Sequence, residues 1–336
     1  MPKTMKPRRL ALAALTAIAL SLAACGAPAA DPDPSSSDSP LEQAPPSSVE
    51  VVDNTGAHVI ALPPQRVVAT DNRLFQTLAA WGVKLAAAPV DLIPADNPYK
   101  TDTSVVNLGN HREPDLEAVV AVQPDLIING QRFSQYAEDF QQLVPEAVLL
   151  TLDPRDGQPF GDELKRQIQV LGQVFGHETE AQALINAYDT AVARVKAVYD
   201  PAQTVMAVIT SGGNVNYSAP GPGRTLGPVY DILGLTPALV EDGSTDHQGD
   251  DISVEAIAAS NPDWILVMDR DAAISASSDG AYVPANELIA NSEALQNVTA
   301  VQAGHIVYMP QYTYVNEGIQ TYTAFFGQLA SALEKG

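Results

Sequence analysis

Short apolar runs alternate with amphipathic stretches along most of the chain, and this alternation predicts an α/β fold. The apolar runs have the length and the β-branched content of buried parallel strands. They occupy 83–90, 148–152, 204–210 and 305–309. Between the runs, apolar residues recur at helical spacing, as in 72–81, where Gly82 would end the helix. We therefore expect short strands joined by helices, in mostly parallel sheets.

Several segments have a less regular pattern. Residues 49–56 are expected to form a strand and a turn, and 58–71 a second strand. We expect 91–108 to be a loop. The segment 211–227 is rich in glycine and proline, and it is expected to be a loop that opens onto a helix.

One pattern occurs twice. Residues 114–132 and 252–270 align without a gap and share seven of nineteen positions. Each copy predicts a short capped helix, a Pro-Asp turn and a brief buried strand, and each ends on an arginine, Arg132 or Arg270. Ligands of open α/β sheets bind outside the carboxyl ends of the strands. The repeat therefore predicts two similar lobes, each presenting one arginine to a shared cleft.

The longest helical pattern covers 178–199, without glycine or proline. Its apolar face contains Ala181, Leu184, Ile185, Tyr188, Val192 and Val195. At about 1.5 Å per residue this helix is about 33 Å long, which is the diameter of a small domain. We expect a rigid interdomain helix at 178–200, between an N-terminal lobe at 49–177 and a C-terminal lobe at 201–336.

The N-terminus has the pattern of a targeting segment. Four basic residues precede the apolar stretch 10–22, which is too short to span a bilayer, and small residues then lead to Cys25. This resembles the lipobox of bacterial lipoproteins and implies cleavage before Cys25 and lipid on its thiol. The alternative is a membrane anchor with a chance cysteine. Residues 25–48 are expected to be a flexible tether.

Composition narrows the possible ligands. Without residues 1–24 the chain has 14 Lys and Arg against 40 Asp and Glu, a net charge of 14 − 40 = −26. Such a surface repels nucleic acid. The single cysteine excludes a disulfide framework or a thiolate metal site. An anionic ligand would require the scarce positive side chains to gather at its site.

The order of elements resembles the solute-binding lipoproteins of ABC importers for iron–siderophores, haem and vitamin B12. That group has two α/β lobes bridged by one long helix. The C-terminal half is most similar to the ferric-catecholate binders of the group. The motifs that carry this resemblance are Gly221-x-x-Arg224, His247, Ile252-Ser-x-Glu255, Asn261-Pro-Asp263, Asp269-Arg270 and Pro310-x-Tyr312-x-Tyr314.

The resemblance implies a siderophore site made of cleft arginines, here Arg132, Arg224 and Arg270. Guanidinium groups remain charged, stack on aromatic rings and donate to oxygen, which suits an anionic ferric catecholate. The alternative is that each arginine forms an ordinary surface ion pair. The same resemblance places Tyr217 and Asn72 along the cleft.

The resemblance also implies that His247 and Tyr314 bind ferric iron when a tetradentate siderophore leaves two positions open, with Tyr312 as the nearest alternative to Tyr314. The family has His-Gly, whereas Gln248 is inserted here before Gly249. A surface histidine and aromatic packing are the alternatives. The iron complex is the ligand, and we expect no cofactor.

Glu117 and Glu255 occupy the same position of the repeat, in the first turn of each expected helix. The resemblance implies that they dock onto arginines of the permease, one from each lobe. The alternative is that they only complement the helix dipole.

These observations favour a monomeric receptor that binds a ferric siderophore, of catecholate type, and delivers it to an ABC permease. Haem, a corrinoid or a hydroxamate siderophore are alternative ligands, and zinc or manganese is a weaker one because the histidines are scattered. A hydrolase or lyase is the remaining class. The sequence contains no Gly-x-Ser-x-Gly, His-Glu-x-x-His or phosphate-loop motif.

Overall fold

Five parallel strands form the sheet of the N-terminal lobe in the computed structural model, which describes residues 47–110, 112–274 and 282–336. They are β3 (Val67–Ala69), β4 (Leu85–Ala88), β5 (Val106–Asn107), β6 (Leu126–Asn129) and β7 (Val148–Thr151). The helices of this lobe are α1 (Phe75–Ala80), α2 (Leu116–Val122) and α3 (Ala137–Leu143). The sheet order is β5-β4-β3-β6-β7, so the direction of winding reverses between β3 and β6.

The prediction of one strand over 58–71 was wrong. β2 (Ala57–Ala61) pairs antiparallel with β1 (Ser48–Val52), and β3 is a separate strand of the parallel sheet. Pro63 and Pro64 separate the two because proline cannot donate to a strand ladder. The expected loop 91–108 also contains short regular elements. It contains 3₁₀ turns at Val90–Leu92 and Pro98–Lys100 and ends in β5.

The C-terminal lobe repeats the parallel architecture. Its strands are β8 (Thr204–Ser211), β9 (Asn214–Tyr217), β10 (Thr236–Pro237), β11 (Trp264–Asp269) and β12 (Ile306–Tyr308). Its helices are α6 (Gly227–Leu233), α7 (Val254–Ser260), α8 (Arg270–Ile274), α9 (Ala285–Asn291), α10 (Thr299–Ala303) and α11 (Ile319–Leu333). The order β10-β8-β11-β12 reverses between β8 and β11. Both lobes thus have a point where a ligand is expected.

Part of the expected loop 211–227 is a strand. β9 pairs antiparallel with β8, and the hairpin turns through Gly212 and Gly213. Both glycines have positive φ angles, 59° and 81°. A two-residue turn that matches the twist of a hairpin requires this left-handed backbone, which glycine adopts without a Cβ clash.

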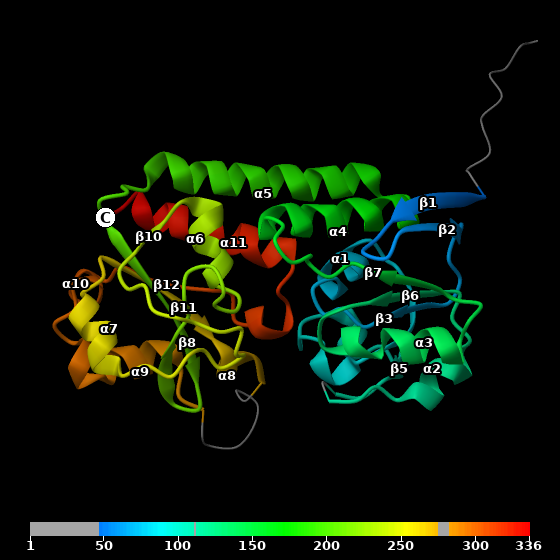
Figure 1. Cartoon of the computed structure of the whole chain (residues 1–336), viewed down its shortest axis with the longest axis horizontal. Helices are drawn as coiled ribbons and strands as arrows, with labels where there is room; N and C mark the ends of the chain where they lie inside the picture. Colours follow the sequence, from blue (N-terminus) through cyan, green and yellow to red (C-terminus); the bar gives the residue numbers. More distant parts are fainter. Residues whose placement is uncertain (1–46, 111, 275–281) are drawn as a thin grey trace, which may run out of the picture. The chain divides into compact units, whose positions relative to one another are not determined.

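The prediction of a long bridging helix is confirmed. α5 (Glu178–Val198) follows α4 (Phe160–Phe175) and lies along both lobes (Figure 1). It packs against α4 at one end and against α6 and α11 at the other. All six residues of its expected apolar face are buried in or packed against the hydrophobic core of the C-terminal lobe.

Both repeat copies fold alike. Asp115 and Ser253 cap α2 and α7: their side chains accept hydrogen bonds from the backbone nitrogens three residues on, those of Ala118 and Ala256, at 2.9 and 3.1 Å. The aspartates of the Pro-Asp turns then accept from the backbone at the start of the neighbouring strand. Asp125 accepts a hydrogen bond from the backbone nitrogen of Arg66 at 2.9 Å, and Asp263 accepts one from the backbone nitrogen of Thr204 at 2.7 Å. The duplicated carboxylate therefore aligns the central strand pair of each sheet.

Candidate functional site

The two repeat arginines meet at the carboxyl ends of the sheets. Arg132 lies in the 3₁₀ segment Gln131–Tyr136 that follows β6, and Arg270 opens α8 directly after β11. Each therefore stands beside the strand pair at which its sheet reverses. This is the arrangement that the repeat predicts, because equivalent strand ends place equivalent residues at the same edge.

Tyr314 stands at the centre of the site, in the 3₁₀ turn Thr313–Val315. The guanidinium carbons of Arg132 and Arg224 each lie 5.1 Å from the centroid of its ring, and that of Arg270 lies 4.7 Å away. All three distances fall within the range of cation–π contacts. One buried phenol ring thus collects three of the chain's positive charges, from both lobes. We refer to these four residues as the Tyr314 cluster.

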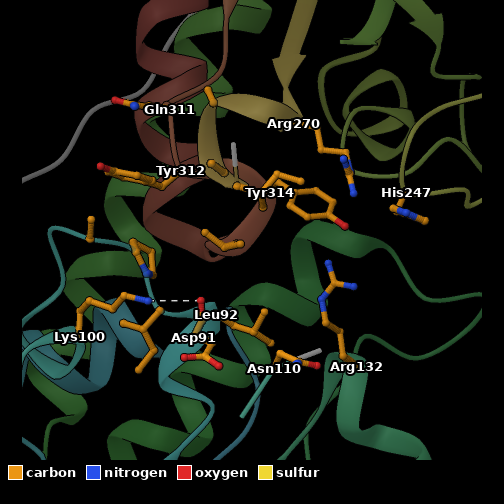
Figure 2. Close-up of a pocket in the computed structure, with 17 residues that line it drawn as sticks. Asp91, Leu92, Lys100, Asn110, Arg132, His247, Arg270, Gln311, Tyr312 and Tyr314 are labelled. Atoms are coloured by element: carbon orange, nitrogen blue, oxygen red, sulfur yellow. Dashed lines mark hydrogen bonds between the residues drawn. The ribbon is translucent and has the colours of Figure 1, made fainter. Parts of the chain in front are cut away.

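A cavity of about 620 Å³ adjoins the Tyr314 cluster. Its walls come from the 91–100 region and Asn110 of the N-terminal lobe, and from α8 and the 311–315 segment of the C-terminal lobe. Figure 2 shows the hydroxyl of Tyr314 directed toward the side chains of Arg132, Arg270 and His247. This volume lies within the range of small-molecule sites.

The three arginines differ in their counterions. Arg224 is paired with Glu317 at 3.1 Å, and Arg270 with Asp271 at 3.2 Å. Within the described residues Arg132 has no acidic partner. The Nε of Arg270 is buried and lacks a hydrogen-bond acceptor in the same part of the chain. The cluster therefore retains positive charge and an unused donor for an anionic ligand.

His247 faces Tyr314, with 6.5 Å between the ring centroids. Partial burial, and then the positive charge of Arg270, lower the pKa of its imidazole below the ordinary value. A neutral imidazole has a lone pair available for a metal ion. His247 faces Tyr314 although Gln248 is inserted after it. The backbone nitrogen of Gln248 donates to Asp246 at 2.7 Å, and its carbonyl accepts from Asn216 at 2.8 Å.

Two predicted cleft residues lie elsewhere. Tyr217 is fully buried in the C-terminal lobe, and its hydroxyl donates to the carbonyl of Leu239 at 2.8 Å. Its position on β9 directs it into the sheet's core. Asn72 is also buried and is not part of the cavity wall. Tyr312 lines the cavity, but it is Tyr314 whose ring lies among the arginines.

Glu117 and Glu255 are exposed in the first turns of α2 and α7. Neither forms an ion pair with another residue in the described ranges. They lie outside the cavity wall. The repeat therefore places one exposed glutamate on the surface of each lobe.

Sequence reasoning missed Glu317. Its carboxylate is almost completely buried beside Arg224 and also accepts a hydrogen bond from Gln131 of the other lobe at 2.8 Å. Burial alone would raise the pKa of Glu317, but the charge of Arg224 and the hydrogen bonds from Arg224 and Thr225 lower it below the ordinary value. It stands in a neutral, tyrosine-rich segment, and no motif marked it.

The sequence model of the periplasmic binding protein family matches residues 67–313. The chain belongs to this family of binding proteins. The petrobactin-binding protein YclQ of Bacillus subtilis is 27% identical over 277 residues, which cover 81% of this chain and 83% of the relative. The ferric-anguibactin-binding protein FatB of Vibrio anguillarum is 29% identical over 262 residues, covering 77% and 79%.

A solved structure has the same fold. The crystal structure of YclQ matches the structure of this chain with a TM-score of 0.72 at 24% identity. The match covers 86% of this chain and 99% of YclQ. The expected fold, with two mostly parallel sheets and one long helix between the lobes, is thereby confirmed. In the described part of the chain, no helix is both long and apolar enough to cross a membrane.

Proposed function

We propose that this family member is an extracytoplasmic receptor that binds a ferric siderophore of the catecholate class at the Tyr314 cluster and delivers it to an ABC permease. The observation that carries the proposal is the gathering of three guanidinium groups within 5.1 Å of one phenol ring beside a ligand-sized cavity. Two relatives that bind petrobactin and ferric anguibactin support it.

The chemistry of the cluster suits a ferric catecholate. Each guanidinium has several N–H donors in a plane, and it can donate to catecholate oxygens or stack on a catechol ring. Hydrogen bonds to charged oxygens are stronger than neutral ones. Haem or a corrinoid would use mainly apolar walls, and a hydroxamate complex has little negative charge. Three arginines therefore favour the catecholate.

Tyr314 and His247 are proposed to complete the coordination of iron when the siderophore supplies only four oxygens. Metal bonds to oxygen and nitrogen are about 2 Å long. Two rings whose centroids are 6.5 Å apart are therefore compatible with one ion between their polar ends. The lowered pKa of His247 keeps its imidazole neutral and able to bind metal.

The counterions favour a ferric catecholate with one negative charge over one with three. Glu317 and Asp271 compensate two of the three arginines, which leaves about one positive charge at the cluster. A ferric bis-catecholate has one negative charge, and a ferric tris-catecholate has three. The bis-catecholate matches the charge of the site and also leaves two iron positions open for Tyr314 and His247.

Cys25 and the tether at 25–48 belong to the same proposal, although all of this segment except residues 47 and 48 lies outside the described residues. Signal cleavage after residue 24 and lipidation of Cys25 would hold the receptor at the outer face of the cytoplasmic membrane. The whole chain, expressed in a bacterium with labelled palmitate, should incorporate label, and a Cys25→Ser variant should not. Label in both forms would contradict the anchor.

Fluorescence titration of the mature receptor tests the ligand class. The panel is a ferric bis-catecholamide, a ferric hydroxamate, haem and cobalamin. Saturable quenching by the bis-catecholamide alone is the expected result. Saturation by another member of the panel would replace the catecholate assignment, and no binding by any of the four would overturn the proposed function.

A further inference from the structure

Two residues beside the cleft arginines have left-handed backbone. Gln131, which precedes Arg132, has a φ of 54°, and Thr225, which follows Arg224, has a φ of 65°. This region is uncommon for any residue with a side chain, and a β-branched residue such as threonine is a genuine outlier there. Strained positions of this kind persist only where the surrounding structure holds them.

The carboxylate of Glu317 accepts hydrogen bonds from the side chains of both of these residues. The Oε2 of Glu317 accepts a hydrogen bond from the side-chain amide of Gln131 at 2.8 Å, and its Oε1 accepts one from the hydroxyl of Thr225. The same carboxylate receives Arg224 through Nε and Nη2, at 3.2 and 3.1 Å. Its partners thus come from both lobes and flank two of the three arginines of the Tyr314 cluster.

Glu317 is itself fixed in place. A side chain at the neighbouring Gly318 would collide with the backbone carbonyl of Arg73, so this segment lies directly against the N-terminal lobe. On the other side, the hydroxyl of Tyr322 donates to the carbonyl of Thr225 at 2.9 Å. The backbone nitrogen of Gln131 donates to Asp153 at 2.8 Å. The segment of Glu317 and its two partners are therefore held by contacts within both lobes.

We infer that Glu317 is a positioning residue of the ligand site. By holding Gln131 and Thr225 in their left-handed conformations, it aims Arg132 and Arg224 at Tyr314 and joins the two lobes at this point. The inference rests on the proposed function for its ligand. Repulsion and positioning have opposite effects on the affinity for the ligand. A carboxylate beside an anion site should weaken binding by repulsion, whereas positioning makes the same carboxylate necessary for tight binding.

The substitution Glu317→Gln separates these two effects, since it removes the charge and keeps the size. Simple electrostatics predicts tighter binding of an anionic ligand. Positioning predicts weaker binding, because only one of the two terminal atoms of a glutamine accepts hydrogen bonds, so the partners of the other atom lose their acceptor. Glu163→Gln is the matched control. Glu163 is also a buried glutamate paired with two arginines, Arg155 and Arg166, and it is not part of the cavity wall.

The first readout needs no ligand. The guanidinium carbons of Arg132 and Arg224 lie 5.1 Å from the centroid of the Tyr314 ring, so their side-chain NMR signals should be displaced by the ring current. We expect this displacement to disappear in Glu317→Gln and to remain in Glu163→Gln. Because this measurement is independent of the siderophore, it tests the positioning role even if the proposed function fails.

The second readout is the dissociation constant of a ferric bis-catecholamide. We expect Glu317→Gln to raise it about tenfold or more, the scale of a lost charge-assisted hydrogen bond, and Glu163→Gln to leave it unchanged. If Glu317→Gln does not fold, Gln131→Ala removes only the donor from the N-terminal lobe and should disturb Arg132 alone. Unchanged NMR signals with equal or tighter binding would overturn the inference.

Discussion

The guanidinium carbon of Arg132 lies 5.1 Å from the ring of Tyr314, although one residue follows β6 of the N-terminal lobe and the other follows β12 of the C-terminal lobe. Within the described residues Arg132 has no acidic partner, in contrast to Arg224 and Arg270. Its whole charge is therefore available to a ligand, and it forms part of the connection between the lobes.

Arg132→Ala should weaken binding of a ferric bis-catecholamide by about 10- to 100-fold, the equivalent of roughly 1.5–3 kcal/mol for a hydrogen bond to a charged group. Isothermal titration measures the change. Arg194→Ala is the control, because Arg194 on α5 is paired with Glu334, directly after α11, away from the cavity. Equal losses in both variants would show that the effect is one of overall charge and not of the site.

The contribution of His247 should depend on pH in a defined direction. Its pKa is lowered from 6.5, so the imidazole stays neutral above pH 6.5 and takes up a proton only at a lower pH. The affinity ratio of the wild type to His247→Ala should be constant from pH 8 to 6.5 and fall toward one below that range. A ratio that is already one at pH 8 would remove His247 as an iron ligand.

Most of the architecture could be predicted from the sequence because it is encoded locally. The caps of α2 and α7, the Pro-Asp turns and the apolar face of α5 are patterns within about twenty residues, and each folds as expected. Arg132 and Arg270 were found for the same reason, since the repeat fixes their place at the end of a strand.

The rest depends on contacts between distant segments. Tyr217 was placed along the cleft, but pairing of β9 with β8 turns its side chain into the core, and no local pattern shows which face of a short strand is buried. Glu317 was missed because its partners, Gln131 and Thr225, are 186 and 92 residues away. Only the folded chain brings them together.

Acid should destabilise the fold partly through Glu163. Burial would raise the pKa of this carboxyl, but hydrogen bonds from Arg155 and Arg166 lower it from 4.5 to about 2. A lowered pKa gives stability that is present above pH 4.5 and is lost as pH falls toward 2. Glu163→Gln should cost about 3 kcal/mol at neutral pH, and urea unfolding should show this difference shrinking between pH 4.5 and 3. A difference that does not depend on pH would contradict the ion-pair explanation.

Glu117 and Glu255 should matter for delivery and not for binding. Both are exposed and lie outside the cavity wall. Reversing their charge, as in Glu117→Lys with Glu255→Lys, should abolish uptake of labelled iron by cells and leave the affinity for the ferric siderophore unchanged. Glu138→Lys, an exposed change in the first turn of α3, is the control. Normal uptake by the double variant would leave the pair only the role of complementing the helix dipoles.

The visible spectrum of a ferric bis-catecholamide, recorded with the wild type and with Tyr314→Phe, tests the central claim most directly. Phenolate bound to iron changes the charge-transfer band of the complex, and phenylalanine keeps the ring that the arginines surround but has no oxygen. We expect the wild type to shift the band and Tyr314→Phe to bind more weakly without the shift. An identical shift with both proteins, or no shift with either, would show that Tyr314 does not coordinate the iron.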